Sequence, residues 1–156
     1  MDQLVHQQLL EYYNLSRETD ILYRKVADQS GISVAMFWVL YAVCVYQDNC
    51  TQSDICTGWM LNKQTVNSAL KKLARDGYIT LETMESDRRS KWIRLTPQGK
   101  KYIETYIRPV LEIEKRSFSA MSDEERTMLL SGSRRFFQLL QENFEAMLGI
   151  AQEVSQ

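Results

Sequence analysis

The residues with the clearest chemistry lie on one face of a helix expected over residues 62–76. If Val66 marks the centre of the buried side, a step of about 100° per residue places apolar side chains around it and polar ones opposite. The polar face combines amides, hydroxyls and cations: Gln64, Thr65, Asn67, Ser68, Lys71, Lys72 and Arg75. No acidic residue lies between Asn62 and Arg75, an unusual composition for a surface helix unless a polyanion faces it. The pattern predicts a helix that contacts nucleic acid.

Two kinds of contact are expected from this helix and the segment after it. Gln and Asn side chains can pair bidentately with adenine, and Ser or Thr can reach base edges or phosphates. The candidate base-reading residues are Gln64, Thr65, Asn67 and Ser68. Cationic groups and a helix N-terminus suit phosphate instead, and these candidates are Asn62, Lys63, Lys71, Lys72, Arg88 and Lys91.

A basic cluster follows at residues 85–91, between two runs that are typical of β-strands. Arg88, Arg89 and Lys91 lie close together there, and an arginine at a β-turn can enter a minor groove, whose negative potential is greatest where it narrows. Asp87 would repel phosphate, so we expect it to stabilise the turn by accepting hydrogen bonds. A solvated hairpin tip is the alternative interpretation.

The charge is distributed unevenly along the chain. The net charge of the 156 residues is −1. Residues 63–101 contain ten Lys or Arg and four acidic residues, which makes this segment +6 and the remainder −7. A polyanion would be attracted to the one region and repelled by the others.

The elements that must position these residues follow from periodicity and turn signals. Helices are expected over residues 4–27, 34–46, a short stretch after 51, 62–76, a long segment from 97 and a last one from 122, with strands at 78–84 and 92–95. Capping side chains support several of the helix starts: Ser33, Thr51 with Asp54, Asn62, Thr96 and Ser122 with Glu125.

This order predicts a mainly α fold with a small β-hairpin wing, a winged helix-turn-helix with N- and C-terminal dimerisation helices. We expect a single domain over residues 1–156. Its winged core would span about 33–97, and the dimerisation helices about 4–27 and 97–148. The terminal helices carry apolar stripes that a small winged core cannot cover, so we expect two copies of the chain to pair through them. Folding of these helices back on their own core is the alternative.

Three motifs in this chain resemble the MarR family of bacterial transcriptional regulators. The wing motif is Asp87-x-Arg89 followed, after five residues, by Leu95-Thr96-x-x-Gly99. Upstream stand Thr51-Gln52-x-Asp54-Ile55 and Thr65-Val66-x-x-x-Leu70-x-x-Leu73-x-x-x-Gly77-Tyr78-Ile79, which are similar to the family's third and recognition helices. The resemblance covers nearly the whole chain, including the order of the helices.

The resemblance implies a homodimer that binds double-stranded DNA at a palindromic operator. The helix at 62–76 would read successive major grooves, and Arg89 of each subunit would enter the flanking minor groove. It also implies a small phenolic or other aromatic effector that releases DNA. Two residues depart from the family pattern, Cys56 and the large Trp59. The first helix has no cysteine, so the family's peroxide-sensing mechanism is not expected.

The remaining reactive residues give weaker indications. Cys44, Cys50 and Cys56 are spaced six apart, which fits no familiar zinc site, and with His6 as the single histidine we expect no metal and no cofactor. Cys44 should be a core residue, whereas Cys50 and Cys56 leave a redox-responsive regulator as an alternative. A candidate ligand pocket comprises Tyr12, Tyr13, Trp38 and Tyr41, although simple core packing explains the same pattern.

The chain lacks the motifs of common enzyme classes. It has no glycine-rich phosphate loop and no nucleophile elbow, so we do not expect an enzyme. No apolar run approaches the roughly 20 residues that cross a bilayer, and the N-terminus lacks a signal-peptide pattern. We therefore expect a cytoplasmic protein that does not bind membranes. A winged-helix protein-interaction module that binds no operator remains an alternative function.

Overall fold

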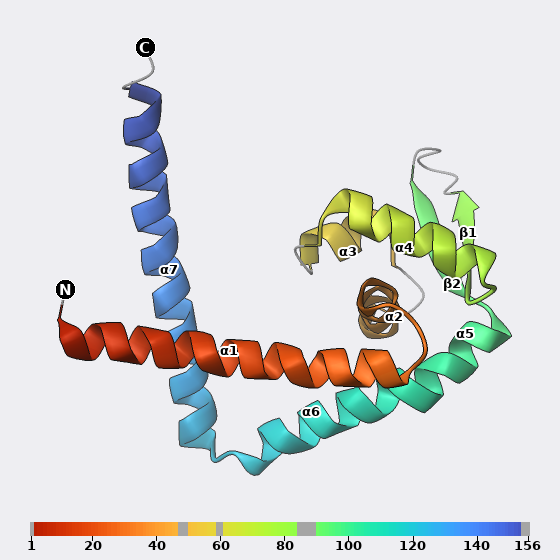
Figure 1. Cartoon of the computed structure of the whole chain (residues 1–156), viewed down its shortest axis with the longest axis horizontal. Coiled ribbons are helices and arrows are strands. Elements are labelled where there is room, and N and C mark those ends of the chain that lie inside the picture. Colours follow the sequence, from red (N-terminus) through yellow and green to blue (C-terminus); the bar gives the residue numbers. More distant parts are fainter. Residues whose placement is uncertain (1, 47–49, 59–60, 84–89, 154–156) are drawn as a thin grey trace. The chain divides into compact units, whose positions relative to one another are not determined.

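The computed structural model describes residues 2–46, 50–58, 61–83 and 90–153 (Figure 1). The elements along the chain are α1 (Gln3–Gln29), α2 (Val34–Tyr46), α3 (Gln52–Gly58), α4 (Lys63–Arg75), β1 (Ile79–Thr83), β2 (Lys91–Leu95), α5 (Pro97–Tyr102), the π-helical turn η2 (Ile103–Ile107), α6 (Arg108–Ala120) and α7 (Asp123–Glu153). The chain forms two compact units, Met1–Leu111 and Glu112–Gln156, so the boundary falls inside the predicted dimerisation segment. The winged helix-turn-helix order predicted from the sequence is confirmed.

The predicted caps determine where the helices begin. Thr51 and Asp54 form a capping box: the Thr51 N–H donates to the Asp54 carboxylate at 2.8 Å, and the Asp54 N–H donates to the Thr51 hydroxyl at 3.3 Å. Asn62 accepts from the backbone N–H of Gln64 at 2.8 Å and so starts α4. Gly77 follows α4 with a φ of 81°, a left-handed conformation that ends the helix and that glycine adopts without strain.

The wing is an antiparallel hairpin. β1 pairs with β2 in a register that places Ile79 opposite Leu95 and Thr83 opposite Lys91. A backbone hydrogen bond joins the chain before α3 to β2: the Ile93 N–H donates to the Cys50 carbonyl at 2.9 Å. The segment before α3 is thereby tied to the returning strand of the wing.

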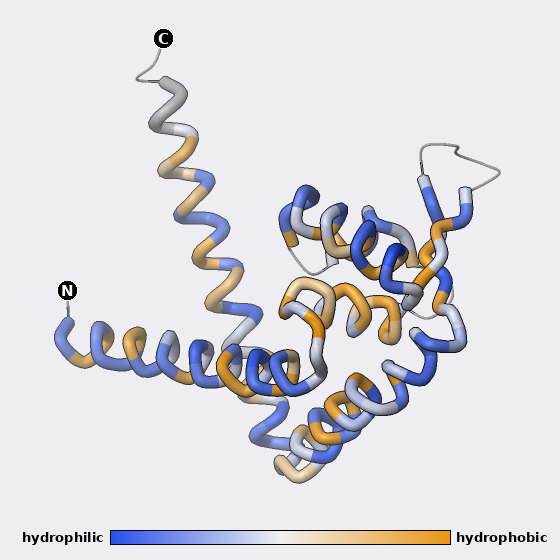
Figure 2. Tube along the Cα trace, turned by 45° about the vertical axis from the view of Figure 1, so that its right-hand side comes forward, coloured by the Kyte–Doolittle hydropathy of each residue, from blue (hydrophilic) through white to orange (hydrophobic). Residues whose placement is uncertain are grey.

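Helix α2 forms the centre of the core of the first unit. It contacts α1, α3, α4 and η2, and it lies between α1 and α4 (Figure 1). Figure 2 shows it as hydrophobic along most of its length. Its buried side chains are Met36, Phe37, Val39, Leu40, Tyr41, Ala42 and Val43. A helix surrounded by other elements must be apolar on nearly every side, which is the pattern predicted for residues 34–46.

The long helix expected from Pro97 is present but not uniform. The Thr96 hydroxyl accepts from the Gly99 N–H at 3.1 Å, as predicted for the N-cap, and Pro97 occupies the first turn. After Tyr102 the backbone makes one π-helical turn, η2, before α6 continues. Within η2 the Thr105 hydroxyl donates to the Lys101 carbonyl at 2.8 Å, the oxygen that the Thr105 N–H would bond in a regular α-helix.

The second unit consists mainly of α7. Its start is the predicted capping box: the Ser122 N–H donates to the Glu125 carboxylate at 2.7 Å, and the Glu125 N–H donates to the Ser122 hydroxyl at 3.2 Å. These bonds hold the pKa of Glu125 below its usual range. Within the described residues no single helix is long and apolar enough to span a membrane; α1 and α2 would reach that length and composition only as a pair bent by 97°.

Candidate nucleic-acid interface

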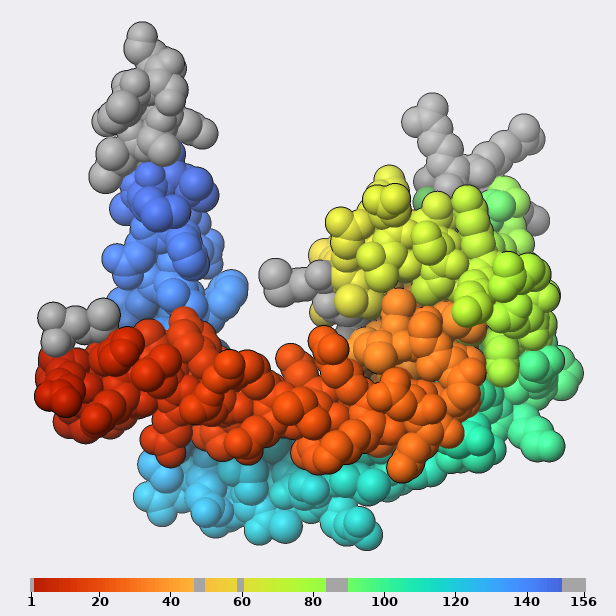
Figure 3. Space-filling view, viewed as in Figure 1, coloured from red at the N-terminus to blue at the C-terminus, as the bar shows by residue number. Residues whose placement is uncertain are grey.

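Helix α4 separates its apolar and polar sides as the sequence predicts. Val66, Ala69, Leu70 and Leu73 are buried, with exposed fractions of 5% or less. The opposite side is exposed along the whole helix and comprises Lys63, Gln64, Thr65, Asn67, Ser68, Lys71, Lys72 and Arg75. In Figure 3 α4 forms part of the outer surface of the first unit. The predicted base-reading and phosphate-binding residues of this helix are therefore all accessible.

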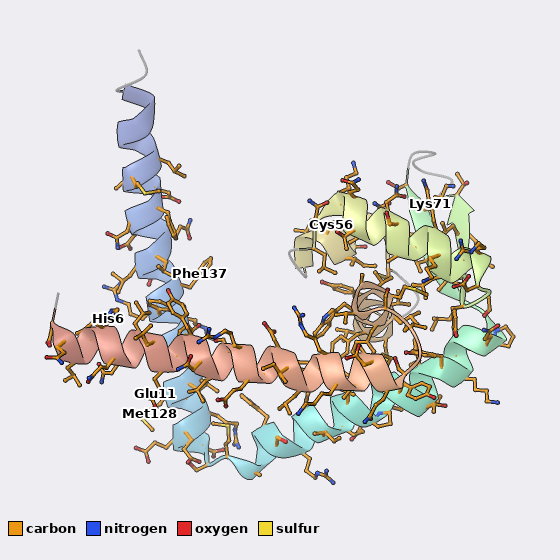
Figure 4. All side chains as sticks on the ribbon, in the orientation of Figure 1. His6, Glu11, Cys56, Lys71, Met128 and Phe137 are labelled. Carbon is orange, nitrogen blue, oxygen red and sulfur yellow. The ribbon has the colours of Figure 1, made fainter. Side chains whose placement is uncertain are left out.

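A groove lies on the side of α4 that faces α3 and the wing. It has a volume of about 470 Å³. Its floor contains Leu70, Leu81 and Ile93, and three lysines line it, namely Lys63, Lys71 and Lys91. Figure 4 labels Lys71 on α4 and Cys56 on α3, two residues that line this groove. The structure thus brings together lysines that lie 28 residues apart in the sequence.

A second groove runs along the other side of α4, next to the first turn of α2. It encloses about 400 Å³. The α4 residues that line it are Gln64, Thr65, Ser68, Ala69 and Lys72, and those from the α2 end are Ser33, Ala35 and Met36. The four predicted base-reading residues are therefore divided between two sides of the helix, with Asn67 toward α3 and Gln64, Thr65 and Ser68 toward α2.

The N-terminal end of α4 carries a hollow lined mainly by amides. It has a volume of about 540 Å³ and is lined by Gln52, Asn62, Lys63, Gln64 and Asn67. Two of these amides bind backbone: Asn62 caps α4, and the Gln52 amide donates to the Lys63 carbonyl at 3.4 Å. Sequence reasoning assigned no role to Gln52. Its partner is 11 residues away, so no local signal in the sequence points to this contact.

A hydrogen-bonded junction joins the end of α4 to the start of α5 and thereby orients the wing. The Thr96 hydroxyl donates to the Gly77 carbonyl at 2.6 Å, and the Thr96 N–H donates to the Tyr78 carbonyl at 3.1 Å. The Gln98 amide donates to the Asp76 carbonyl at 3.3 Å. Because both strands of the wing leave from this junction, the junction sets the direction of the hairpin relative to α4.

The wing tip lies outside the described residues. Asp87, Arg88 and Arg89 belong to the segment 84–89, so their predicted roles stay predictions. Lys91 begins β2 and is exposed. On the neighbouring positions of the hairpin Arg94 pairs with Glu82 at 3.2 Å and lies over the Trp92 ring at 5.5 Å.

The cysteines differ strongly in exposure. Cys50 is completely buried, and burial, with a smaller contribution from the charge of Asp54, raises the pKa of its thiol to about 12. Burial also raises the pKa of Cys44, which is half-buried as part of the core periphery. Cys56 is half-buried in the groove between α3 and the wing. Among the described residues no three His, Cys, Asp or Glu side chains gather as metal ligands.

The four aromatic residues of the predicted ligand pocket form two separate pairs. The Trp38 and Tyr41 rings lie 5.4 Å apart in the core, and Tyr23, which the sequence did not single out, lies 4.9 Å from Trp38. Tyr12 and Tyr13, 5.8 Å apart, are about half exposed on α1. Because Tyr12 precedes Tyr23 by about 16 Å of helix, one chain does not bring the two pairs together.

Comparison with known proteins agrees with this geometry. Residues 30–90 match the model of the MarR family. The regulator PecS of Dickeya dadantii is 35% identical over 77 residues, 49% of this chain and 46% of PecS, so the chain spans about half the length of this curated relative.

Solved structures match over a longer part of the chain. A MarR family regulator from Neisseria meningitidis is 28% identical with a TM-score of 0.72, covering 93% of this chain and 98% of that one. A mutant of MepR from Staphylococcus aureus, bound to an oligodeoxyribonucleotide, is 25% identical with a TM-score of 0.51, covering 85% and 97% of the two chains. With its winged helix-turn-helix and the polar exposed face of α4, the chain is similar to MarR family regulators in fold, and the model of that family matches residues 30–90.

Proposed function

We propose that this chain is a sequence-specific DNA-binding transcriptional regulator, a homodimeric repressor that binds a palindromic operator and releases it when a small molecule binds. The observation that carries the proposal is the exposed face of α4, which bears amides, hydroxyls and lysines and no acid, with a groove on each side. A DNA major groove is wide enough to admit such a helix. The MepR relative bound to an oligodeoxyribonucleotide supports the same ligand.

Each group of residues has a defined role in this proposal. Gln64, Thr65, Asn67 and Ser68 contact base edges in the major groove. Asn62, Lys63, Lys71, Lys72, Arg88 and Lys91 contact phosphates. Arg89 enters the adjacent minor groove, and Asp87 stabilises the turn that presents it.

Dimerisation is supported by the apolar surface of each unit. On α1 the exposed apolar side chains include Leu4, Leu15 and Leu22, and on α7 they include Met128, Phe137 and Leu148, all more than half exposed. Patches of this kind are rare on monomeric proteins. Two copies paired through these helices would cover the apolar side chains. The two recognition helices would then be related by a two-fold axis.

The effector is proposed to be a small aromatic compound. Trp38 and Tyr41 offer ring contacts at the edge of the core, and Tyr12 and Tyr13 present aromatic rings on α1. In a dimer, the Tyr12 and Tyr13 pair of one subunit could approach Trp38 of the other, which one chain cannot achieve alone. A cytoplasmic location would suit a regulator of this kind.

The decisive experiment is a selection of bound fragments from random DNA by the full chain at near-physiological salt, with the Arg89→Ala variant in parallel. We expect an enriched palindrome whose half-sites lie about one helical turn apart. Loss of the arginine should weaken operator binding by more than about 1 kcal/mol, because a charge-assisted contact is removed. Equal affinity of the two proteins in a salt-controlled titration would contradict the role of Arg89, and absence of any enriched sequence would contradict operator binding.

The second candidate is a protein-interaction module whose lysine-lined groove binds an acidic partner. That groove, with Lys63, Lys71 and Lys91 around an apolar floor, is the observation that favours it. The two candidates differ in what the amides contribute. Operator binding should lose sequence preference in Gln64→Ala or Asn67→Ala, whereas an electrostatic protein contact should weaken only when lysines are removed. The redox alternative is limited by Cys50, because a completely buried thiol with a pKa of about 12 is not the reactive thiolate that sensing requires.

A further inference from the structure

We propose that Gln64 and Asn67 determine the sequence preference of this chain and that both read adenine. The inference rests on the proposed function, since it requires α4 to enter a major groove of DNA. It goes further by naming the bases and by separating two readers from the larger set of polar residues on α4.

The hydrogen bonds at the start of α4 distinguish these two amides from their neighbours. Gln52 and Asn62 line the same hollow, but each uses its side chain to hold the backbone of the first turn of α4. The side chains of Gln64 and Asn67 make no hydrogen bond to any other part of the chain that the structure describes, and both are exposed. The first pair therefore positions the helix end, and the second pair has its donors and acceptors available to a ligand.

The position of the pair on α4 favours base contact over phosphate contact. Residues in the N-terminal part of a recognition helix are those that reach base edges. Gln64 lies in the first turn of α4 and Asn67 in the next, and both line the hollow at the N-terminal end of this helix. Thr65 and Ser68 do not line that hollow; they line the groove next to α2, to which Gln64 also contributes.

The chemistry of the pair specifies adenine. A carboxamide donates to adenine N7 and accepts from the adenine N6 amino group, whereas guanine is read mainly by arginine or lysine at O6 and N7. The one arginine among the described residues of α4 is Arg75, at its last position, and this side chain pairs with Asp76 at 3.1 Å. Lys63 and Lys71, which line the groove that faces the wing, are assigned to phosphate contacts in the proposed function.

The spacing of the pair fixes how the adenines are separated. Two residues three positions apart on a helix are displaced by about 4.5 Å along its axis. Base pairs are stacked about 3.4 Å apart, so the two amides reach base pairs one or two steps from each other. Each half-site should therefore contain two adenines within three consecutive base pairs, on either strand.

The test replaces single adenines in the selected operator by 7-deazaadenine, which lacks the N7 acceptor and leaves base pairing intact. Affinities are measured at one salt concentration for the wild-type chain and for Gln64→Ala, Asn67→Ala and Lys71→Ala. With the wild-type chain two positions per half-site should each weaken binding about fivefold, the effect of losing one hydrogen bond. One effect should disappear in Gln64→Ala and the other in Asn67→Ala, while Lys71→Ala should bind more weakly everywhere and keep both.

The outcomes separate this inference from the function on which it rests. If an operator is enriched but no 7-deazaadenine position matters, or if both effects persist in the two amide variants, the adenine assignment is wrong and operator binding stands. If the wild-type chain enriches no sequence, operator binding fails and the inference fails with it. Thermal unfolding by circular dichroism confirms that each variant is folded, as expected for substitutions at exposed positions.

Discussion

At the scale of single residues, the hydroxyl of Thr96 connects three backbone groups. It donates to the Gly77 carbonyl at 2.6 Å and accepts from the Gly99 N–H at 3.1 Å, in a partly buried position. Thr96→Val keeps the shape but leaves these groups without a partner, so it should lower the free energy of unfolding by about 1–3 kcal/mol. Denaturant titration measures this loss. Thr96→Ser is the matched control and should unfold close to wild type; a Val variant as stable as wild type would refute the role of the hydroxyl.

The thiol of Cys50 gives a second prediction at this scale. Burial raises its pKa to about 12, above the value of about 8.5 for a free thiol. Between these two pH values the unfolded chain ionises Cys50 while the folded chain keeps it neutral, so the contribution of this group to stability falls as the pH rises. At pH 8 an alkylating reagent should label Cys56 in the folded protein and Cys50 only after denaturation. Rapid labelling of Cys50 without denaturant would show that it is more accessible than its burial indicates.

Lys71 represents the residues expected to contact phosphate. It is exposed on α4 and lines the groove between α3 and the wing. Lys71→Ala should weaken binding to all DNA sequences alike and reduce the slope of log affinity against log salt by about one. Titrations at several salt concentrations measure that slope. A loss confined to one sequence would instead identify Lys71 as a base reader.

At the scale of elements, the contact between α5 and the end of α4 is close enough to require a glycine. A Cβ at Gly99 would lie 2.0 Å from the Tyr78 carbonyl oxygen, a backbone atom that cannot move without displacing the wing. Gly99→Ala should therefore destabilise the fold by about 1–3 kcal/mol, the usual cost of overpacking.

The matched control is Gly132→Ala, in the middle of α7. A Cβ there would meet no atom within 4 Å, and a helical glycine exchanged for alanine gains about 0.5–1 kcal/mol. The two variants make the same chemical change and should shift the unfolding midpoint in opposite directions. If both stabilise the chain, the junction between α4 and α5 is more compliant than the structure indicates.

The sequence predicted the elements well wherever a local signal marks their ends. The limits of α4 follow from Asn62 and Gly77, and the apolar side was found from Val66 by helical period alone. Features that depend on distant residues could not be predicted. The donation from Gln52 to the Lys63 carbonyl, and the division of the α4 face by two grooves, depend on what packs beside that helix. The π-helical turn was missed because it is a change in hydrogen bonding within a sequence that continues to favour helix.

At the scale of the whole molecule, the exposed apolar side chains of the long helices require a partner. Phe137 projects from α7 and is 68% exposed (Figure 4). Phe137→Glu should raise the dissociation constant of the proposed dimer roughly tenfold or more, because an unpaired carboxylate would be buried in an apolar interface. Sedimentation equilibrium measures this constant.

The control for that variant is Gln138→Glu, which introduces the same charge about 100° away around the helix. It should dimerise like wild type. If both variants remain dimers at the concentrations where wild type does, α7 does not contribute the interface at this position. If the wild-type chain itself is a monomer, the pairing of two chains through their terminal helices is wrong.

The exposed face of α4, which carries no acidic residue, also determines how the protein behaves during purification. By its sequence pI of about 5.9, the protein should pass through a cation exchanger at pH 7.5. Lys63, Lys71 and Lys91 line one groove beside α4, so a sulfated polysaccharide resin such as heparin should retain the protein, because local rather than total charge governs adsorption. The same property means that nucleic acid from the host cell will accompany the protein through lysis. A wash at high salt is therefore needed before any affinity for DNA is measured.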